Sequence, residues 1–141
     1  MLQEIKEQVK KRLSKAKGSH DWEHTQRVYK LAVHIGEKEK ADVEILKLAA
    51  ILHDIARPDE DEQKGVICHA KKGAEVASEI LAEHGLDKEK IKKVVHCIEC
   101  HRFRNKKTPK TKEAKVIFDA DKLDCIGAVG IGRAFLFAGE V

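Results

Sequence analysis

A histidine and an aspartate, His53 and Asp54, directly follow a run of apolar residues, and this limits the folds open to the chain. Residues 46–52 are Leu, Lys, Leu, Ala, Ala, Ile and Leu, which are mostly apolar and good helix formers. We therefore expect Asp54 to lie on a largely buried helix. Burial of a carboxylate is costly unless a cation or strong donors meet it. A neighbouring imidazole does not remove that cost, but a divalent metal ion bound by both side chains does.

Two further candidate ligands stand far from this pair in the sequence. His24 lies at the start of a second helical pattern, and Asp121 is flanked by apolar residues in segment 118–124. Two imidazoles and two carboxylates suit one divalent ion such as Mn²⁺, Fe²⁺, Co²⁺ or Zn²⁺, with Ni²⁺ and Mg²⁺ also open. Four protein ligands leave one or two positions for water and a substrate oxygen, as a catalytic metal requires. His24, His53, Asp54 and Asp121 are our candidate metal ligands.

Apolar residues recur at helical spacing along almost the whole chain, which predicts a compact all-α, multi-helix bundle with the metal site between helices. The stripes are Leu2-Ile5-Val9-Leu13, His24-Val28-Leu31-Ile35, Ala70-Ala74-Ala77-Leu81, Ile91-Val94-Val95-Ile98 and Ala114-Ile117-Asp121-Cys125. The expected helix stops and caps are Gly18, Gly85, Asp42, Asp87 and Thr111. We expect loops at 59–64 and 102–112, and no strands.

The length and charge of the chain are typical of one soluble domain. A chain of 141 residues can bury a single core, so we expect one domain over residues 1–141. Lys and Arg number 28 against 24 Asp and Glu, a formal net charge of +4 that does not by itself indicate nucleic-acid binding. No apolar run approaches the length of a membrane span. We therefore expect a cytoplasmic protein without a membrane partner.

The four cysteines are expected to remain reduced thiols and to form no disulfide framework. Cys97 and Cys100 form a C-x-x-C, which we interpret as two small residues buried on one helix face. Gly127, Gly130 and Gly132 lack the third glycine and the preceding strand of a dinucleotide-binding loop. Close helix packing is the expected reason for these glycines.

Four segments together resemble the HD-domain superfamily of metal-dependent phosphohydrolases, in particular its small stand-alone bacterial and archaeal members. They are His-Asp-Trp-x-His-x-x-Arg-Val at 20–28, Leu-His-Asp-Ile at 52–55, His-x-x-x-x-His-Arg-Phe at 96–103 and Glu-Ala-Lys-x-x-x-Asp-Ala-Asp-Lys-Leu-Asp-x-x-Gly at 113–127. The resemblance covers about residues 19–135. It implies an enzyme that hydrolyses a nucleotide or another small phosphorylated metabolite through a metal-activated water. The family usually continues for several helices beyond segment 127–133, so we expect those helices to be missing from this chain.

A phosphate beside the metal requires positive or hydrogen-bonding groups around it. Arg27, Arg102 and Lys122 are the expected phosphate-binding cations, and Lys122 is preferred because it adjoins Asp121. His101, next to Arg102, is expected to face the phosphate or to support a ligand.

Other catalytic assignments rest on position in the sequence. Asp54, Arg27 and Lys122 are expected to act in catalysis, and His20 to orient the phosphate or donate a proton. Asp124, one helical turn after Asp121, is expected to hold a ligand or Lys122 in place. The general acid stays open among Asp59, Glu60 and Glu62.

Two alternatives to hydrolysis remain. If His69 and either His96 or His101 join the first four ligands, a second metal can bind, and a dinuclear iron oxygenase on the same scaffold becomes an alternative. A metal-containing regulatory or nucleic-acid-binding module is the other, since a basic loop contains Arg102, Arg104, Lys106, Lys107, Lys110 and Lys112. Almost no aromatic residues accompany that loop, which disfavours base stacking and hence nucleic acid as a partner. A homo-oligomer remains open.

Overall fold

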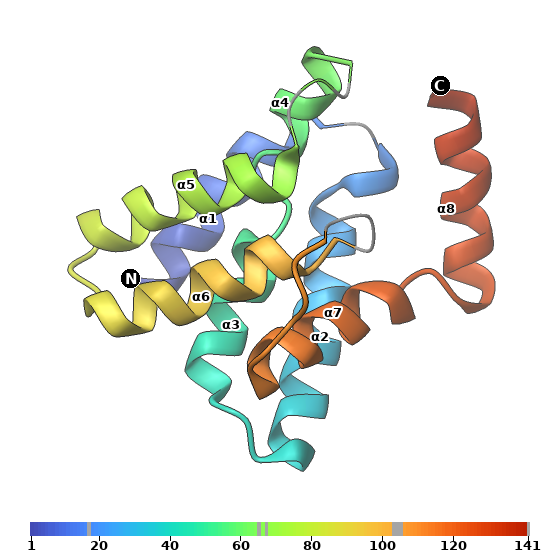
Figure 1. Cartoon of the computed structure of the whole chain (residues 1–141). Helices are drawn as coiled ribbons and strands as arrows, with labels where there is room; N and C mark the ends of the chain where they lie inside the picture. Colours follow the sequence, from blue (N-terminus) through green and yellow to red (C-terminus); the bar gives the residue numbers. More distant parts are fainter. Residues whose placement is uncertain (17, 65, 67, 103–105, 141) are drawn as a thin grey trace.

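The protein is all-α in the computed structural model, which describes residues 1–16, 18–64, 66, 68–102 and 106–140 (Figure 1). The elements are α1 (Leu2–Leu13), the 3-10 turn η1 (Gly18–His20), α2 (Trp22–Glu39), α3 (Val43–Leu52), α4 (Arg57–Glu62), α5 (His69–Glu83), α6 (Lys88–Cys100), α7 (Lys112–Leu123) and α8 (Gly127–Glu140). Across these described ranges there is no strand. The expected all-α class is confirmed.

Side-chain caps account for where several helices begin. The carboxylate of Asp42 accepts hydrogen bonds from the backbone N–H groups at the start of α3, and Asp87 does the same for α6. The Thr111 hydroxyl accepts from Ala114 N at the start of α7. Each cap satisfies backbone donors that have no partner within the first turn. These three predicted caps are confirmed, and Gly85, with φ of 72°, follows the end of α5 as expected.

Three predicted boundaries were wrong. The acidic segment 59–64, expected as a loop, lies largely in the short helix α4, where Pro58 occupies the first turn and so loses no hydrogen bond. Helix α3 ends at Leu52, so His53 caps it and Asp54 lies in the turn beyond, not within a helix. Helix α1 ends at Leu13 with Ser14 as its cap, ahead of the expected stop at Gly18.

Helix α3 forms the centre of the core. Its apolar residues are almost completely buried: Ile45, Leu46, Leu48, Ala49, Ala50, Ile51 and Leu52. It packs against α1, α2, α6 and α7, while α5 packs along α6 on one side of the molecule (Figure 1). The C-terminal end of α3 is therefore held among other helices, and the residues that follow it are placed inside the protein.

Helix α8 stands apart from this core and packs mainly on η1 (Figure 1). It begins at Gly127, whose φ of 74° favours glycine. A Cβ on Gly130 would lie 2.2 Å from the Cys125 backbone, which confirms the expected close packing there. At Gly127 and Gly132 nothing lies within 4 Å of an added Cβ, so the packing explanation was wrong for those two residues. Within the described part of the chain, no helix combines the length and apolar character needed to cross a membrane.

Candidate functional site

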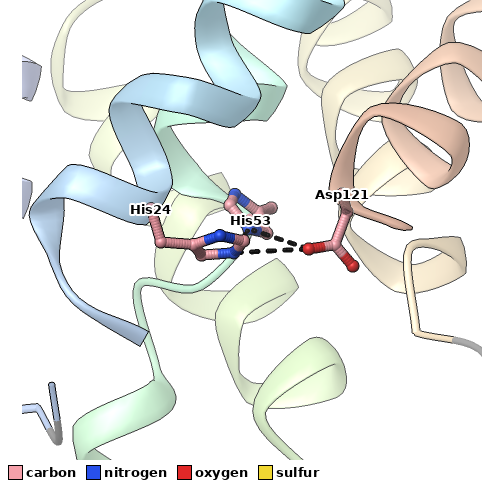
Figure 2. Close-up of side chains that lie close together, drawn as sticks. All are labelled: His24, His53 and Asp121. Carbon is pink, nitrogen blue, oxygen red and sulfur yellow. Dashed lines mark hydrogen bonds and ion pairs between the residues drawn. The ribbon is translucent and has the colours of Figure 1, made fainter. Parts of the chain in front are cut away.

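His24, His53 and Asp121 meet in the middle of the protein, from α2, the end of α3 and α7 (Figure 2). The Nε2 atom of His24 lies 3.3 Å from Oδ1 of Asp121 and 3.3 Å from Nε2 of His53. The Nε2 atom of His53 lies 3.9 Å from the same Asp121 oxygen. Both histidines are buried, with exposures of 1% and 0%. We call these three residues the first ligand group.

A second ligand group, His69, His101 and Asp54, lies beside the first and is buried throughout. Nε2 of His69 and Nε2 of His101 are 3.1 Å apart, and they lie 3.3 and 3.6 Å from Oδ1 of Asp54. The other oxygen of Asp54, Oδ2, lies 3.6 Å from His24 Nε2 and 3.5 Å from His53 Nε2. Asp54 therefore bridges the two groups with one oxygen toward each.

Each of the four ligand histidines has an acceptor at its other ring nitrogen, Nδ1. Backbone carbonyls serve two of them: Ala50 O lies 2.8 Å from Nδ1 of His53, and Ile98 O lies 2.6 Å from Nδ1 of His101. Carboxylates serve the others: Asp124 for His24, at 2.7 Å, and Glu60 for His69. Carbonyl and carboxylate oxygens only accept here, so this arrangement suits the tautomer with the proton on Nδ1 and the Nε2 lone pair facing the cluster.

Two pairs of imidazole nitrogens thus face each other, and a cation is needed between them. The two nitrogen atoms of each pair are 3.1–3.3 Å apart. Their lone pairs repel each other unless a proton or a metal ion lies between them. Ligands about 2.1 Å from one ion lie about 3.0–3.4 Å apart, whether the geometry is octahedral or tetrahedral. The two nitrogen–nitrogen separations lie in this range, as does the shortest nitrogen–oxygen separation in each group, whereas the longest, 3.9 Å between His53 and Asp121, lies beyond it. The residues therefore fit a bound divalent ion in the first group, and the second group offers a comparable set.

The pKa values of His24, His53 and Asp54 reflect the close approach of histidines and carboxylates in this site. Burial disfavours a charged imidazole at His24, but hydrogen bonds with Asp121 and Asp124 outweigh it and raise its pKa to about 9. At His53, where burial dominates, the pKa falls to about 4. Burial also opposes the charge on Asp54, yet the surrounding histidines hold the pKa of that carboxyl well below its usual range. The carboxylates stay ionised and draw positive charge to the cluster.

A cavity of about 470 Å³ opens beside the two ligand groups. Its lining comprises His20, Asp54, Arg57, His69, His101, Arg102, Asp121, Lys122, Cys125, Gly130, Arg133, Ala134 and Phe137. Asp121 is the more exposed of the two ligand carboxylates, with 21% of its side chain accessible against 5% for Asp54. A small molecule in this cavity can therefore reach the cluster from the side of Asp121.

Several predicted site residues line this cavity. Lys122 donates to His101 O and lies 3.1 Å from Oδ2 of Asp121. Arg102 lies 3.1 Å from Glu60 and also faces the cavity. His20 lies with its ring 6.0 Å from that of His24, and burial lowers its pKa to about 3, so it is neutral at pH 7. These positions suit contact with a ligand, and the assigned roles stay predictions.

Arg27 lies elsewhere. Its guanidinium donates to both oxygens of Asp124, at 2.7 and 3.1 Å, and it does not line the cavity. Asp124 in turn holds His24, as expected from its position one turn after Asp121. The geometry therefore places Arg27 behind a ligand, and the expectation that it contacts phosphate finds no support in it.

The three acid candidates and His96 also lie outside the cavity lining. Asp59 pairs with Arg12 at 2.8 Å, and Glu62 is exposed. Glu60 is buried against His69, Arg57 and Arg102. His96 accepts from the backbone N–H of Lys110 and lies outside both ligand groups.

In the basic segment, Lys107 pairs with Glu99, and Lys112 donates to the backbone carbonyl of Glu39. Arg104 lies outside the described residues. The segment therefore offers fewer unengaged charges for nucleic-acid phosphates than its sequence indicates.

Sequence reasoning missed Arg57, Arg133 and Phe137 as cavity residues, and Glu60 as the partner of His69. Arg57 precedes Pro58 and gave no periodic signal, because α4 is too short for one. Arg133 and Phe137 are four residues apart on α8, which is the spacing of one helix face. That spacing, next to a glycine-rich segment, is the signal that could have identified the α8 side of the cavity.

Comparison with known proteins gives the family. The HD-domain family profile matches residues 21–126. An uncharacterized protein of Bacillus subtilis, YpgQ, is 39% identical over 97% of this chain, which spans 66% of that protein. A crystal structure of a predicted HD superfamily hydrolase from an uncultured Thermotogales bacterium matches with a TM-score of 0.83 and 39% identity, over 96% of this chain and 74% of that one. The chain belongs to the HD-domain family.

The crystal structure of B. subtilis YpgQ in complex with ADP also matches, with a TM-score of 0.75 and 38% identity. The match covers 99% of this chain and 68% of that one. The expected family and the helical fold around a histidine and aspartate cluster are thus confirmed. The chain spans about two-thirds of the length of the curated B. subtilis relative.

Proposed function

We propose that this protein is a metal-dependent phosphohydrolase that acts on a nucleotide or another small phosphorylated metabolite. The observation that carries the proposal is the bridging of two buried ligand groups by Asp54 at the edge of a cavity that also contains cations. When bound, a divalent ion supplies Lewis acidity, which activates water and polarises a phosphoryl oxygen.

The residues of the chain have separate tasks in this proposal. His24, His53, Asp54 and Asp121 would hold the catalytic ion, and His69 and His101 would hold a second ion with Asp54. Asp124 and Glu60 fix the ring orientation of His24 and His69.

In this proposal a phosphate binds next to Asp121, in the cavity that the cations Arg57, Arg102 and Lys122 also line. Their charges stabilise the negative charge on the phosphoryl oxygens. His20, neutral at pH 7, donates its ring N–H to the same oxygens.

The nucleotide part of the proposal draws on a relative. B. subtilis YpgQ, with 38% identity over most of this chain, has been crystallised in complex with ADP. A cavity of about 470 Å³ is large enough for an organic molecule with attached phosphates. A nucleotide is therefore our preferred substrate class for this chain.

The test is a screen for phosphate and pyrophosphate release from nucleotides and sugar phosphates with Mn²⁺, Co²⁺, Ni²⁺ or Mg²⁺. We expect release that stops on chelation of the metal, and that falls by at least about 1000-fold in His53→Ala and Asp54→Ala, since each removes a ligand. His34→Ala, at an exposed histidine, is the matched control and should keep full activity. Full activity in His53→Ala and Asp54→Ala would refute the assigned site.

The second ligand group also favours a second candidate, a dinuclear iron oxygenase, which needs two metals in each chain. Iron-loaded protein that consumes O₂ with an organic substrate, and releases no phosphate in the screen, would select this function. The cations around the cavity favour a phosphorylated substrate, so we rank hydrolysis first.

A further inference from the structure

The cavity has two chemically different ends. Arg57, Arg102 and Lys122 surround the end at the ligand groups, where phosphate is proposed to bind. Helix α8 also lines the cavity, with Arg133 and with three residues that have no polar side-chain atoms, Gly130, Ala134 and Phe137. These three residues are spaced by four and three positions, so they lie on one face of the helix. A ligand that fills the cavity therefore has a charged end and an apolar end.

The cavity has room for more than a phosphate group. Cavities of about 300–1,000 Å³ hold drug-sized organic molecules. At about 470 Å³, this one is much larger than a phosphate group needs. Its substrate therefore carries an organic part that extends from the ligand groups toward α8.

Phe137 presents an aromatic surface to that organic part. Its side chain is 48% exposed although it lines the cavity. Its ring meets the ring of His20 in a T-shaped contact with the centroids 6.3 Å apart, and about half of the residue remains accessible. Flat aromatic groups stack on such a ring, and nucleobases do so whatever their identity.

The α8 side of the cavity offers few groups that could read the edge of a base. Gly130, Ala134 and Phe137 have no polar side-chain atoms. The guanidinium of Arg133 is engaged, since its Nη1 lies 3.1 Å from Oδ2 of Asp124 and 3.3 Å from the Asp124 carbonyl oxygen. Strong discrimination between related ligands needs buried hydrogen-bonding groups, and an apolar wall supplies little of it.

We propose that α8 forms a nucleobase-binding wall in which the Phe137 ring stacks on the base, next to Ala134, without selecting among the four bases. This inference rests on the proposed function, because it assumes that the phosphates lie at the ligand groups. It adds that the protein distinguishes nucleotides from phosphates without a base, and does so through α8.

The experiment compares two phenylalanines on the same helix. Phe137→Ala removes the proposed stacking surface, whereas Phe135→Ala removes an equal side chain that is 77% exposed and lies outside the cavity lining. The probes are α,β-methylene-ADP and methylenediphosphonate, which carry the same non-hydrolysable phosphates with and without a nucleoside. Affinities for Mn²⁺-loaded protein are measured by calorimetry.

We expect Phe137→Ala to weaken binding of α,β-methylene-ADP by about 5- to 150-fold, which is the range for loss of one base–aromatic stack. Binding of methylenediphosphonate should not change, Phe135→Ala should resemble the wild type, and Phe137→Trp should restore affinity. The corresponding GDP, UDP and CDP analogues should bind within about tenfold of one another, since the Arg133 guanidinium is held by Asp124 and the other α8 residues of the wall have no polar side-chain atoms.

Two results would overturn the inference. One is wild-type protein that binds α,β-methylene-ADP no tighter than methylenediphosphonate. The other is an equal loss of affinity in the Phe135 and Phe137 variants. These binding measurements need no turnover, so they can fail while phosphate release is observed, or succeed where no phosphate is released. A result against base stacking on α8 can therefore be distinguished from a result against the proposed hydrolysis.

Discussion

Asp124 holds His24 in place through a hydrogen bond of 2.7 Å between Oδ2 and the ring atom Nδ1. The same carboxylate accepts from Arg27, and Arg133 lies 3.1 Å from it. It is buried, and although burial raises its pKa, the hydrogen bonds with His24 and Arg27 lower that pKa to about 2. Asp124 therefore stays charged and keeps Nε2 of His24 directed at the first ligand group.

This relationship predicts the effect of Asp124→Asn on metal binding. The amide keeps the size of the side chain but loses the charge that fixes the imidazole and makes it a better ligand. Loss of such a partner typically weakens metal binding by about 10- to 100-fold. We expect that loss in a Mn²⁺ titration of metal-free protein. Asp119→Asn, at an exposed aspartate on the same helix, is the control and should bind as the wild type does. Equal affinity in the two variants would contradict the role given to Asp124.

The two ligand groups predict two metal ions in each chain. Elemental analysis of the wild type after loading with Mn²⁺ should give about two equivalents, because each group offers three ligand atoms within 4.8 Å of one another. His101→Ala should reduce this to about one, since it removes a ligand of the second group alone. Asp54→Ala should weaken both sites, because its two oxygens face different groups.

His96→Ala is the matched control for His101→Ala. His96 lies five residues earlier and outside both groups, so its loss should leave the metal content unchanged. One equivalent in the wild type, or equal loss in the two histidine variants, would show that the second group does not bind metal.

The regular parts of the fold were predictable because they depend on local rules. Helices α2, α5, α6 and α7 carry apolar stripes at helical spacing, and the caps Asp42, Asp87 and Thr111 each act within three residues. Helix α4 was missed because six residues make less than two turns, too few for a periodic pattern. The end of α3 at Leu52 was missed because the apolar run continues through Ile55 and Ala56, which are buried in the turn.

The metal ligands that lie within the recognised sequence motifs could be predicted, and the others could not. His24, His53 and Asp121 form one group, as expected, and Asp54 lies beside them. What the sequence left open was which distant histidines face Asp54, because that depends on how α5 and α6 pack together. Helix angles could not decide whether His96 or His101 belongs to the second ligand group. His101 is the C-terminal cap of α6, where the chain leaves the helix and regular helical angles no longer apply.

Thiol reactivity should separate Cys97 from Cys125. Cys97 is buried, and burial raises its thiol pKa to about 12, whereas Cys125 is exposed. A rise from 9 to about 12 lowers the thiolate fraction near pH 8 about 1000-fold, and the thiolate is the reacting form. With N-ethylmaleimide at pH 8, peptide mapping should find Cys125 modified within minutes and Cys97 unmodified until denaturant is added. Rapid modification of Cys97 in the folded protein would contradict its burial.

Gly130 and Gly132 should respond in opposite ways to replacement by alanine. At Gly130 the new Cβ would lie 2.2 Å from backbone atoms of Cys125, which cannot move aside as a side chain can. We expect Gly130→Ala to cost about 1–3 kcal/mol in the free energy of unfolding, or to release α8 from its place. At Gly132 nothing lies within 4 Å, so alanine should stabilise the helix by up to about 1 kcal/mol.

Urea denaturation measures the free energy of unfolding in the two glycine variants, and hydrogen exchange of the α8 amides detects local release of the helix. Gly130→Ala should show faster exchange along α8, and Gly132→Ala should show slower exchange. Because Gly130 also lines the cavity, displacement of α8 in the first variant should weaken binding of α,β-methylene-ADP. Binding of methylenediphosphonate should be spared, because the ligand groups lie on other helices. Equal stability in the two variants would show that α8 does not rest on the Cys125 backbone, and that the apolar side of the cavity is not fixed by this contact.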